Sequence, residues 1–302
     1  MSKITAAILK RQDDVCSNLV LKLLTGNTGF QALATSEGEA IMRRDKEDEE
    51  KLQEGIHIAV KKGILPPQPP KTKPVQEINV ASLSAQEVAE KILQSLPSKE
   101  GNVITIEGFS GTGKGTTVGK LREALPRCVA WSNGNVFRCY TYLCQEILSQ
   151  QNKPIAAEHL SPELLTQVSS RVKFVEVSPG QFDTLLDDKK VSEIQNTLLK
   201  APVISQNVPT VAQATQGEVI NFGTDAIKKL SASGYNVILE GRLQTLQYIP
   251  TDLRFRLVIP DVRLLGERRA AQRVMAAALA KVDDSCNEEQ VKQALISAIS
   301  HL

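Results

Sequence analysis

The sequence predicts an α/β protein, a parallel sheet flanked by helices, with a helical extension at the amino terminus. Short apolar runs of strand length alternate with longer segments of helical periodicity, and this alternation is typical of a parallel sheet wrapped by helices. The expected strands are residues 102–106, 128–131, 237–239 and 255–259. The expected helices that separate or follow them are residues 116–125, 136–148, 218–231 and 264–280.

Composition places the chain among ordinary globular proteins. Of its 302 residues 41% are hydrophobic and 23% are charged, and 36 Lys+Arg oppose 34 Asp+Glu, for a formal net charge of +2. This balance, with only 4% aromatic residues, argues against a dedicated nucleic-acid surface. No apolar run approaches the roughly 18–20 residues of a membrane span, so we expect none.

Cysteine and histidine usage predicts an intracellular protein without a histidine or cysteine metal site. The five cysteines are odd in number and form no Cys-x-x-Cys pair, which is typical of reduced thiols, and the three histidines lie far apart in the sequence. The first residues lack the apolar core of a secretory signal. Asp13 and Asp14 argue against a mitochondrial presequence. We expect a cytoplasmic location, with the mitochondrion as the alternative.

Residues 1–64 form the expected helical extension. Apolar residues recur at helical spacing over residues 3–25, and a second helix is predicted over residues 36–62. Charges of both signs fill residues 43–51, which is typical of a solvated helix face with i,i+4 pairs; a partner site is the alternative.

A proline-rich segment, residues 65–78, predicts a linker between the extension and a compact domain over residues 79–302. A polyproline ligand for a partner is the alternative interpretation. Just beyond it, Ser84 and Glu87 have the spacing of a capping box, which predicts the start of a helix over residues 85–96.

A glycine-rich loop directly follows the first predicted strand. Residues 108–117 read Gly-Phe-Ser-Gly-Thr-Gly-Lys-Gly-Thr-Thr, and Gly-x4-Gly-Lys between a strand and a helix is the pattern of a phosphate-binding loop. Glycines let backbone N–H groups point at phosphate oxygens, and the following helix adds the partial positive charge of its N-terminus. A glycine-rich turn without a ligand is the alternative.

Residues of this loop have expected roles toward a nucleotide. Lys114 would bridge the terminal phosphates, and Thr116, or Thr117 beside it, would place a hydroxyl near a magnesium ion. The residues expected to hold the nucleotide are Ser110, Gly111, Thr112, Gly113, Lys114, Gly115, Thr116 and Thr117.

Three further segments carry arginines at positions that could face a ligand. They are residues 132–138, 240–242 and 267–273. Ligands of open α/β sheets bind beyond the carboxyl ends of the strands, and Arg242 lies at such an end. Phosphoryl transfer spreads negative charge over the moving group, so convergent arginines, always charged and forked, suit this chemistry.

Together these motifs resemble the nucleoside-monophosphate kinase family, most closely its cytidylate kinase branch, over residues 101–295. Residues 108–116 match the family's phosphate loop, and residues 134–138 are similar to a segment whose arginine contacts the acceptor phosphate. The other similar segments are residues 204–211, 240–242, 267–273 and 289–291. The resemblance implies that ATP and Mg²⁺ are cofactors and that a phosphate passes to a nucleoside monophosphate.

The resemblance also implies individual roles. The catalytic residues would be Lys114, Arg138, Arg242 and Arg273, with Thr116 as the metal ligand. The residues that would hold the acceptor substrate are Asn133, Arg138, Ser205 and Arg242.

Several positions depart from the family pattern. An arginine expected after Pro-x-Val is Ala212, an aspartate expected after Gly-Arg is Leu243, and a serine expected before Gly134 is Asn133. The mobile lid of the family is reduced to residues 274–281. The donor half is therefore intact and the acceptor half is eroded.

Two functions follow from this mixture. The first is an ATP-dependent phosphotransferase acting on CMP, a related nucleotide or another small acceptor. The second is a degenerate kinase retained as a nucleotide-binding structural or regulatory subunit of a larger assembly, with a protein partner contacted through residues 1–78.

Overall fold

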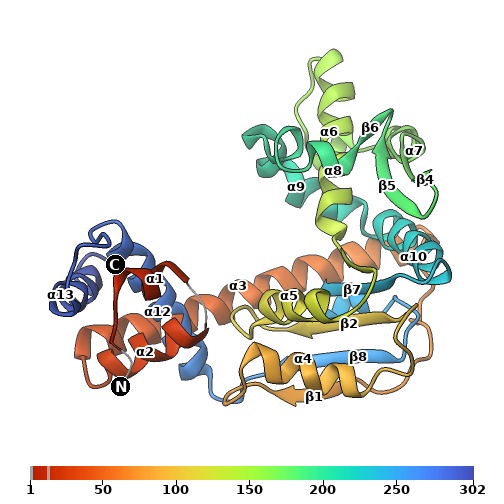
Figure 1. Ribbon diagram of the computed structural model, residues 1–302. Helices are drawn as coiled ribbons and strands as arrows, with labels where there is room; N and C mark the ends of the chain where they lie inside the picture. Colours follow the sequence, from red (N-terminus) through yellow and green to blue (C-terminus); the bar gives the residue numbers. More distant parts are fainter. Residues whose placement is uncertain (1–2, 12–13) are drawn as a thin grey trace.

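A five-stranded parallel sheet forms the centre of the computed structural model, which describes residues 3–11 and 14–302. The strand order is β1-β8-β2-β7-β3, and every neighbouring pair is parallel (Figure 1). This confirms the expected parallel sheet flanked by helices. The strands are β1 (Gln76–Asn79), β2 (Val103–Gly108), β3 (Cys128–Trp131), β7 (Asn236–Gly241) and β8 (Leu253–Val258).

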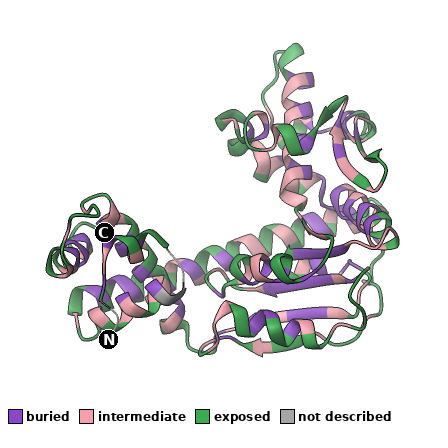
Figure 2. Ribbon diagram, in the orientation of Figure 1, coloured by how far each residue is buried: buried purple, intermediate pink, exposed green. Residues whose placement is uncertain are grey.

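The central strands are apolar because both faces of the sheet are covered. Ile104 and Ile106 of β2 and Phe255 of β8 are at most 1% exposed, and Figure 2 shows the buried residues running along these strands. The helices of this domain are α4 (Ala85–Gln94), α5 (Lys114–Ala124), α6 (Asn133–Gln150), α10 (Gln216–Ala232), α11 (Leu243–Leu246) and α12 (Val262–Leu279). The predicted capping box of Ser84 and Glu87 is present at the start of α4.

One buried asparagine fixes the start of the sheet. The Asn236 side-chain oxygen accepts hydrogen bonds from the backbone and side-chain nitrogens of Asn102, at 3.1 and 2.7 Å. Its amide nitrogen donates to the carbonyl oxygens of Lys99 and Pro126, at 2.8 Å each. Since a buried amide is stable only when its polar atoms are paired, this side chain joins the segments that enter β2, β3 and β7.

The amino- and carboxyl-terminal segments share one hydrophobic cluster. Its helices are α1 (Ala6–Arg11), α2 (Asp14–Leu24), the start of α3 (Thr28–Lys61), α12 and α13 (Glu288–Ile299), and both chain ends lie here in Figure 1. One helix is predicted over residues 3–25, and most of the described residues of this range are helical, in α1 and α2. Residues 1–2 and 12–13, within the predicted extension, lie outside the described residues. Helix α3 begins earlier than predicted because the Asn27 side chain caps it by accepting a hydrogen bond from the Phe30 nitrogen.

Helix α3 runs from this cluster along the sheet domain to α10 (Figure 1). At Gly38 and Gly266 the backbones of α3 and α12 approach so closely that a Cβ on Gly266 would overlap the carbonyl oxygen of Ala34. Farther along, a Cβ on Gly217 of α10 would lie 2.7 Å from the Cβ of Ala59. Close contacts near both ends therefore fix α3 against the compact domain.

The segment predicted as a linker, residues 65–78, ends inside the sheet. Residues Gln76 to Asn79 form the edge strand β1, which pairs with β8 from Phe255 to Val258. This strand is polar and mostly exposed, so its backbone pairing left no apolar signal in the sequence.

A second lobe projects from the sheet domain, above it in Figure 1. Its antiparallel sheet β4-β5-β6 was not expected from the sequence; a turn at Pro179-Gly180, with Gly180 at φ 71°, joins its first two strands. The elements of the lobe, besides most of α6 and two 3-10 turns at residues 157–159 and 198–200, are α7 (Pro162–Ser170), β4 (Val172–Ser178), β5 (Gln181–Leu186), β6 (Lys189–Lys190), α8 (Val191–Ile194) and α9 (Pro202–Ala214).

Across residues 3–11 and 14–302, no helix has both the length and the apolar character that crossing a membrane requires.

The contact between α3 and α12 gives a stability prediction. We expect Gly266→Ala to lower the free energy of unfolding by about 1–3 kcal/mol, because the added methyl group must push two helix backbones apart. Chemical denaturation of the full chain measures this change.

Gly119→Ala is the matched control, since no atom lies within 4 Å of the added methyl group in the middle of α5. It should raise the free energy of unfolding by about 0.5–1 kcal/mol through helix propensity alone. Equal stabilities for Gly266→Ala and the unmodified chain would contradict the close α3–α12 contact.

Candidate functional site

The glycine-rich loop lies where the sequence places it, between the end of β2 and the start of α5. Gly108, Gly111 and Gly113 have φ values of 149°, 87° and 83°, which L-residues rarely adopt. A Cβ on Gly108 would lie 2.6 Å from the carbonyl oxygen of Leu257. The buried Thr112 closes the turn by donating from its hydroxyl to the carbonyl oxygen of Phe109, at 2.9 Å. The glycines are therefore required by the curl of the loop and by its contact with β8.

Lys114 folds back over the loop that precedes it. Its ammonium nitrogen donates to the carbonyl oxygens of Gly108 and Phe109, at 2.8 and 3.0 Å. Burial and the neighbouring Arg242 guanidinium lower the pKa of Lys114, and the carboxylates of Glu240 and Asp45 partly offset this lowering. The lysine is thus a cation held by two backbone oxygens at the mouth of the loop.

An acid from the distant helix α3 occupies one side of the loop. Asp45 is 0% exposed, and one carboxylate oxygen accepts a hydrogen bond from the Ser110 backbone nitrogen at 2.8 Å. The other oxygen accepts from the Ser110 hydroxyl at 2.9 Å. A loop predicted to bind phosphate therefore holds an anion of its own chain.

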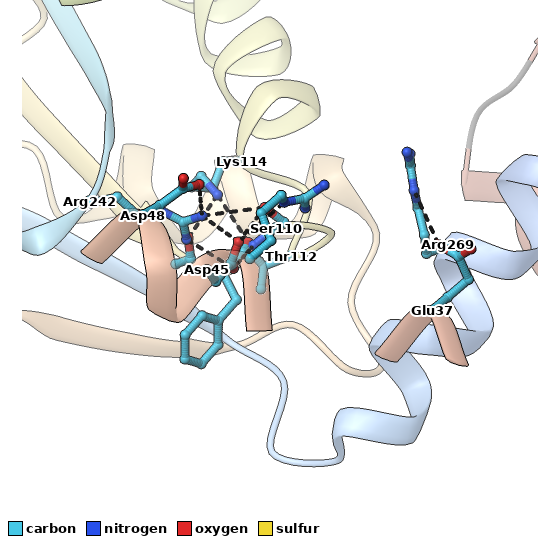
Figure 3. Close-up of polar contacts among 11 residues, drawn as sticks. Glu37, Asp45, Asp48, Ser110, Thr112, Lys114, Arg242 and Arg269 are labelled. Atoms are coloured by element: carbon cyan, nitrogen blue, oxygen red, sulfur yellow. Dashed lines mark hydrogen bonds and ion pairs between the residues drawn. The ribbon is translucent and has the colours of Figure 1, made fainter. Parts of the chain in front are cut away.

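Arg242, at the end of β7, completes this cluster. Its two terminal nitrogens donate to the two Asp45 oxygens, at 3.0 and 2.5 Å, in the bidentate geometry typical of arginine and carboxylate. One of them also donates to the carbonyl oxygen of Gly108 at 3.2 Å, and Asp48 lies 3.9 Å from the other. Figure 3 shows these side chains converging from α3, the loop and β7.

The surroundings of Asp45 favour its ionised form. Burial raises the pKa of Asp45, but the hydrogen bonds from Arg242 and from the Ser110 nitrogen and hydroxyl outweigh burial and hold it below its usual range. The carboxylate is therefore charged at neutral pH and neutralises Arg242 in the interior.

Besides a cavity of about 380 Å³ at Gly108 and Phe109, which Glu49 and Glu107 also line, two cavities lie close to the loop. A cavity of about 320 Å³ lies on the α5 side, where Gly111, Gly113 and Thr116 meet the apolar side chains of Leu83 and Val88. A second, of about 310 Å³, lies beyond the ends of β3 and β7, and its lining residues include Trp131, Asn133, Gly134, Arg242 and Leu52 of α3. The first is the candidate donor site and the second is the candidate acceptor site.

The predicted acceptor residues are only partly brought together. Asn133 lines the second cavity and accepts a hydrogen bond from the Trp131 indole nitrogen at 2.8 Å. Arg138 lies one turn farther along α6, and its buried Nε has no hydrogen-bond partner among the described residues. Ser205 is exposed on α9 in the projecting lobe and bonds to the carbonyl oxygen of Lys200, so the structure does not bring it to the cavity.

Arg273, predicted to balance charge on the transferred group, is not brought to the loop either. It forms an ion pair with Glu37 on α3, and Arg269 lies 3.9 Å from the same carboxylate. Glu37 precedes Asp45 by eight residues, about 12 Å along a helix, and Figure 3 shows Glu37 and Arg269 apart from the cluster at Lys114.

The residues near the loop could hold a magnesium ion only if the phosphates of a bound nucleotide supplied most of its ligands. In the described part of the chain, no group of three or more His, Cys, Asp or Glu side chains could hold a metal. Thr116 is exposed on the donor cavity, and Glu240 lies close to Gly115. Magnesium commonly keeps several waters and takes few protein ligands when phosphates supply the rest, so this sparse set fits it.

A comparison with protein-family models gives no match for this chain, and a comparison with curated proteins gives none either.

Sequence reasoning missed Asp45, the acid at the centre of the site. The spacing of the α3 residues could have indicated that Asp45 is buried. Gly38, Ile41, Asp45 and Ile56 recur at helical spacing and share the buried face of α3. An acid at an apolar position of a helix indicates a buried partner of opposite charge.

The Asp45–Arg242 pair gives a pH prediction. The folded-state pKa of Asp45 lies below the unfolded value of 3.8, so its contribution is present above pH 4 and is lost as pH falls through the folded-state pKa. We expect Asp45→Asn to lower the free energy of unfolding by roughly 3–5 kcal/mol at pH 7, since it strips Arg242 of its counter-charge. Urea unfolding at a series of pH values should show this difference shrinking below pH 4.

Asp48→Asn is the control, because Asp48 is about half exposed and lies 3.9 Å from Arg242. Its effect should stay within about 1 kcal/mol at every pH. A loss for Asp45→Asn that is constant from pH 7 to pH 3 would contradict the assignment of a charged Asp45.

Proposed function

We propose that this chain is a nucleotide-binding subunit of kinase-like construction, in which the glycine loop holds phosphates but transfer to an acceptor is blocked by helix α3. One observation carries the proposal: a fully buried carboxylate, Asp45, sits on the loop and pairs with Arg242. Arg242 is the residue that phosphoryl transfer would need for the charge of the moving group.

Nucleotide binding is supported by the hydrogen bonds that the loop makes to the Asp45 carboxylate. The loop already satisfies a carboxylate with a backbone N–H and a hydroxyl, which is the chemistry of an anion site. The first N–H groups of α5 have no acceptor within the helix, and no side chain caps its N-terminus at Gly113. ATP or a related nucleotide, with Mg²⁺ held chiefly by its phosphates, would complete this side of the loop.

Loss of phosphoryl transfer is supported by the positions of two other residues that were expected at the site. Arg273 is paired with Glu37, and Ser205 is remote from the acceptor cavity. Leu52 of α3 forms part of the wall of that cavity. Transfer requires the acceptor oxygen to stand in line with the terminal phosphate. Because Asp45 lies on the loop and Leu52 lines the acceptor cavity, we infer that α3 obstructs this approach.

The partner in this proposal is another protein of a larger assembly, contacted through residues 1–78. The outward face of α3 offers charged groups for this contact, among them the exposed Arg43, Arg44, Lys46, Glu47 and Glu50.

An active nucleoside-monophosphate kinase is the second candidate function, and the acceptor cavity favours it. The cavity of about 310 Å³ lies at the carboxyl ends of two parallel strands and is lined by Asn133 and Arg242. Arg138 lies nearby and is half-buried, and its buried Nε, which has no partner among the described residues, is a group that an acceptor phosphate would satisfy.

A turnover assay distinguishes these candidates. We expect the full chain with Mg·ATP to release ADP at the same slow rate with and without CMP, UMP, AMP or GMP, because Arg242 is held by Asp45. Acceptor-stimulated ADP release would establish the kinase instead.

Nucleotide binding itself is measured with the Lys114→Ala variant. We expect this change to weaken binding at least about tenfold, since a charge-assisted bond to phosphate is lost. Gly119→Ala, on the same helix with open space around it, should leave the affinity unchanged. Equal affinities for Lys114→Ala and the unmodified chain would argue against binding at this loop.

A further inference from the structure

The position of Asp45 on the loop bears on how many phosphates the loop can accept. We propose that the loop binds a nucleoside diphosphate in preference to a triphosphate, because Asp45 stands where the third phosphate would lie. This inference rests on the proposed nucleotide binding and adds which nucleotide is bound.

The loop has two sides, and they differ in the groups that they offer to a nucleotide. On the side of α3, the Ser110 backbone nitrogen and hydroxyl are both engaged by the Asp45 carboxylate. On the side of α5, Gly111, Gly113 and Thr116 face the donor cavity of about 320 Å³.

A cavity of about 380 Å³ also lies on the α3 side, at Gly108 and Phe109, but three carboxylates, Glu49, Glu77 and Glu107, line it against two arginines. These acids disfavour a phosphate-bearing ligand. We therefore place the nucleoside on the α5 side, where Leu83 and Val88 add apolar surface.

The direction of the phosphates follows from this placement. In a phosphate loop the backbone N–H groups hold the α- and β-phosphates, and the lysine reaches the β- and γ-phosphates. A nucleoside in the α5 cavity thus directs its terminal phosphate toward Lys114 and Arg242. Asp45 already lies there, with both of its oxygens on Arg242 and one on the loop backbone.

Charge makes Asp45 a selective obstacle. Its carboxylate is ionised at neutral pH because Arg242 and Ser110 hold its pKa below the usual range. A third phosphate would bring further negative charge against a buried anion whose one strong counter-charge is already used. The terminal phosphate of a diphosphate would not reach Asp45 but would still bind Lys114. The ammonium group of Lys114 now donates to two backbone carbonyl oxygens.

Helix α3 is fixed on both sides of Asp45, so a phosphate cannot simply push it aside. Seven residues before Asp45, Gly38 meets the backbone of Gly266 in α12. Ten residues after it, a Cβ on Gly55 would lie 2.5 Å from the Gln216 side chain of α10. Moving Asp45 off the loop therefore requires separating α3 from two other helices.

Calorimetric titration of the full chain with ADP, ATP, GDP and GTP, each with Mg²⁺, tests the inference. We expect each diphosphate to bind at least about tenfold more tightly than its triphosphate. Asp45→Asn keeps the shape of the side chain and removes its charge. It should strengthen triphosphate binding and so reduce the ratio of diphosphate to triphosphate affinity at least about tenfold.

Glu37→Gln is the matched control, since it also removes an α3 acid paired with an arginine, about 12 Å along the helix from Asp45. It should leave the ratio of affinities unchanged. The ratio in the unmodified chain is decisive even if Asp45→Asn does not fold.

Each outcome has a distinct meaning. Triphosphates that bind the unmodified chain as tightly as diphosphates would overturn this inference while leaving nucleotide binding intact. A preference for diphosphates that Asp45→Asn, once shown to be folded, leaves unchanged would overturn the role given to Asp45. No saturable binding by any of the four nucleotides would overturn the proposed function together with the inference.

Discussion

The buried ion pair between Asp45 and Arg242 is the constraint on which the rest of the site depends. It joins three parts of the chain, helix α3, the loop after β2 and the end of β7, through one carboxylate. A buried pair is stable only when nearly all its hydrogen bonds are made, so these parts must keep their mutual positions. The close packing of α3 against α12 and α10 supplies the rigidity that this requires.

The parallel core was predicted from the sequence, whereas the edge strand and the antiparallel sheet of the projecting lobe were not. Strands β2, β3, β7 and β8 are apolar enough to be visible as short runs. Strand β1 is polar, because an edge strand needs backbone pairing more than side-chain burial. In the lobe, residues 172–186 carried a readable signal, the Pro179-Gly180 turn between two strand-like runs.

The glycine loop of the candidate site was predicted because its backbone conformation demands particular residues at fixed spacing. Asp45 was not, since which of several acids in a mixed-charge run becomes buried depends on how a whole helix docks on distant elements. Arg273 and Ser205 were expected at the site through a family resemblance. Glu37, the partner of Arg273, lies outside the span of that resemblance, residues 101–295. Ser205 lies inside the span, but similarity of a short segment did not fix where α9 lies relative to the acceptor cavity.

The shared cluster of α1, α2, α12 and α13 has a consequence for the order of events during synthesis. The glycine loop leaves the ribosome some 160 residues before the whole of α12. Until α12 arrives, α3 can pack against α10 near Gly55, but Gly38 has no partner helix, so α3 is held on only one side of Asp45. The loop and the carboxylate that binds it are therefore both synthesised long before the helix contact that fixes them against each other.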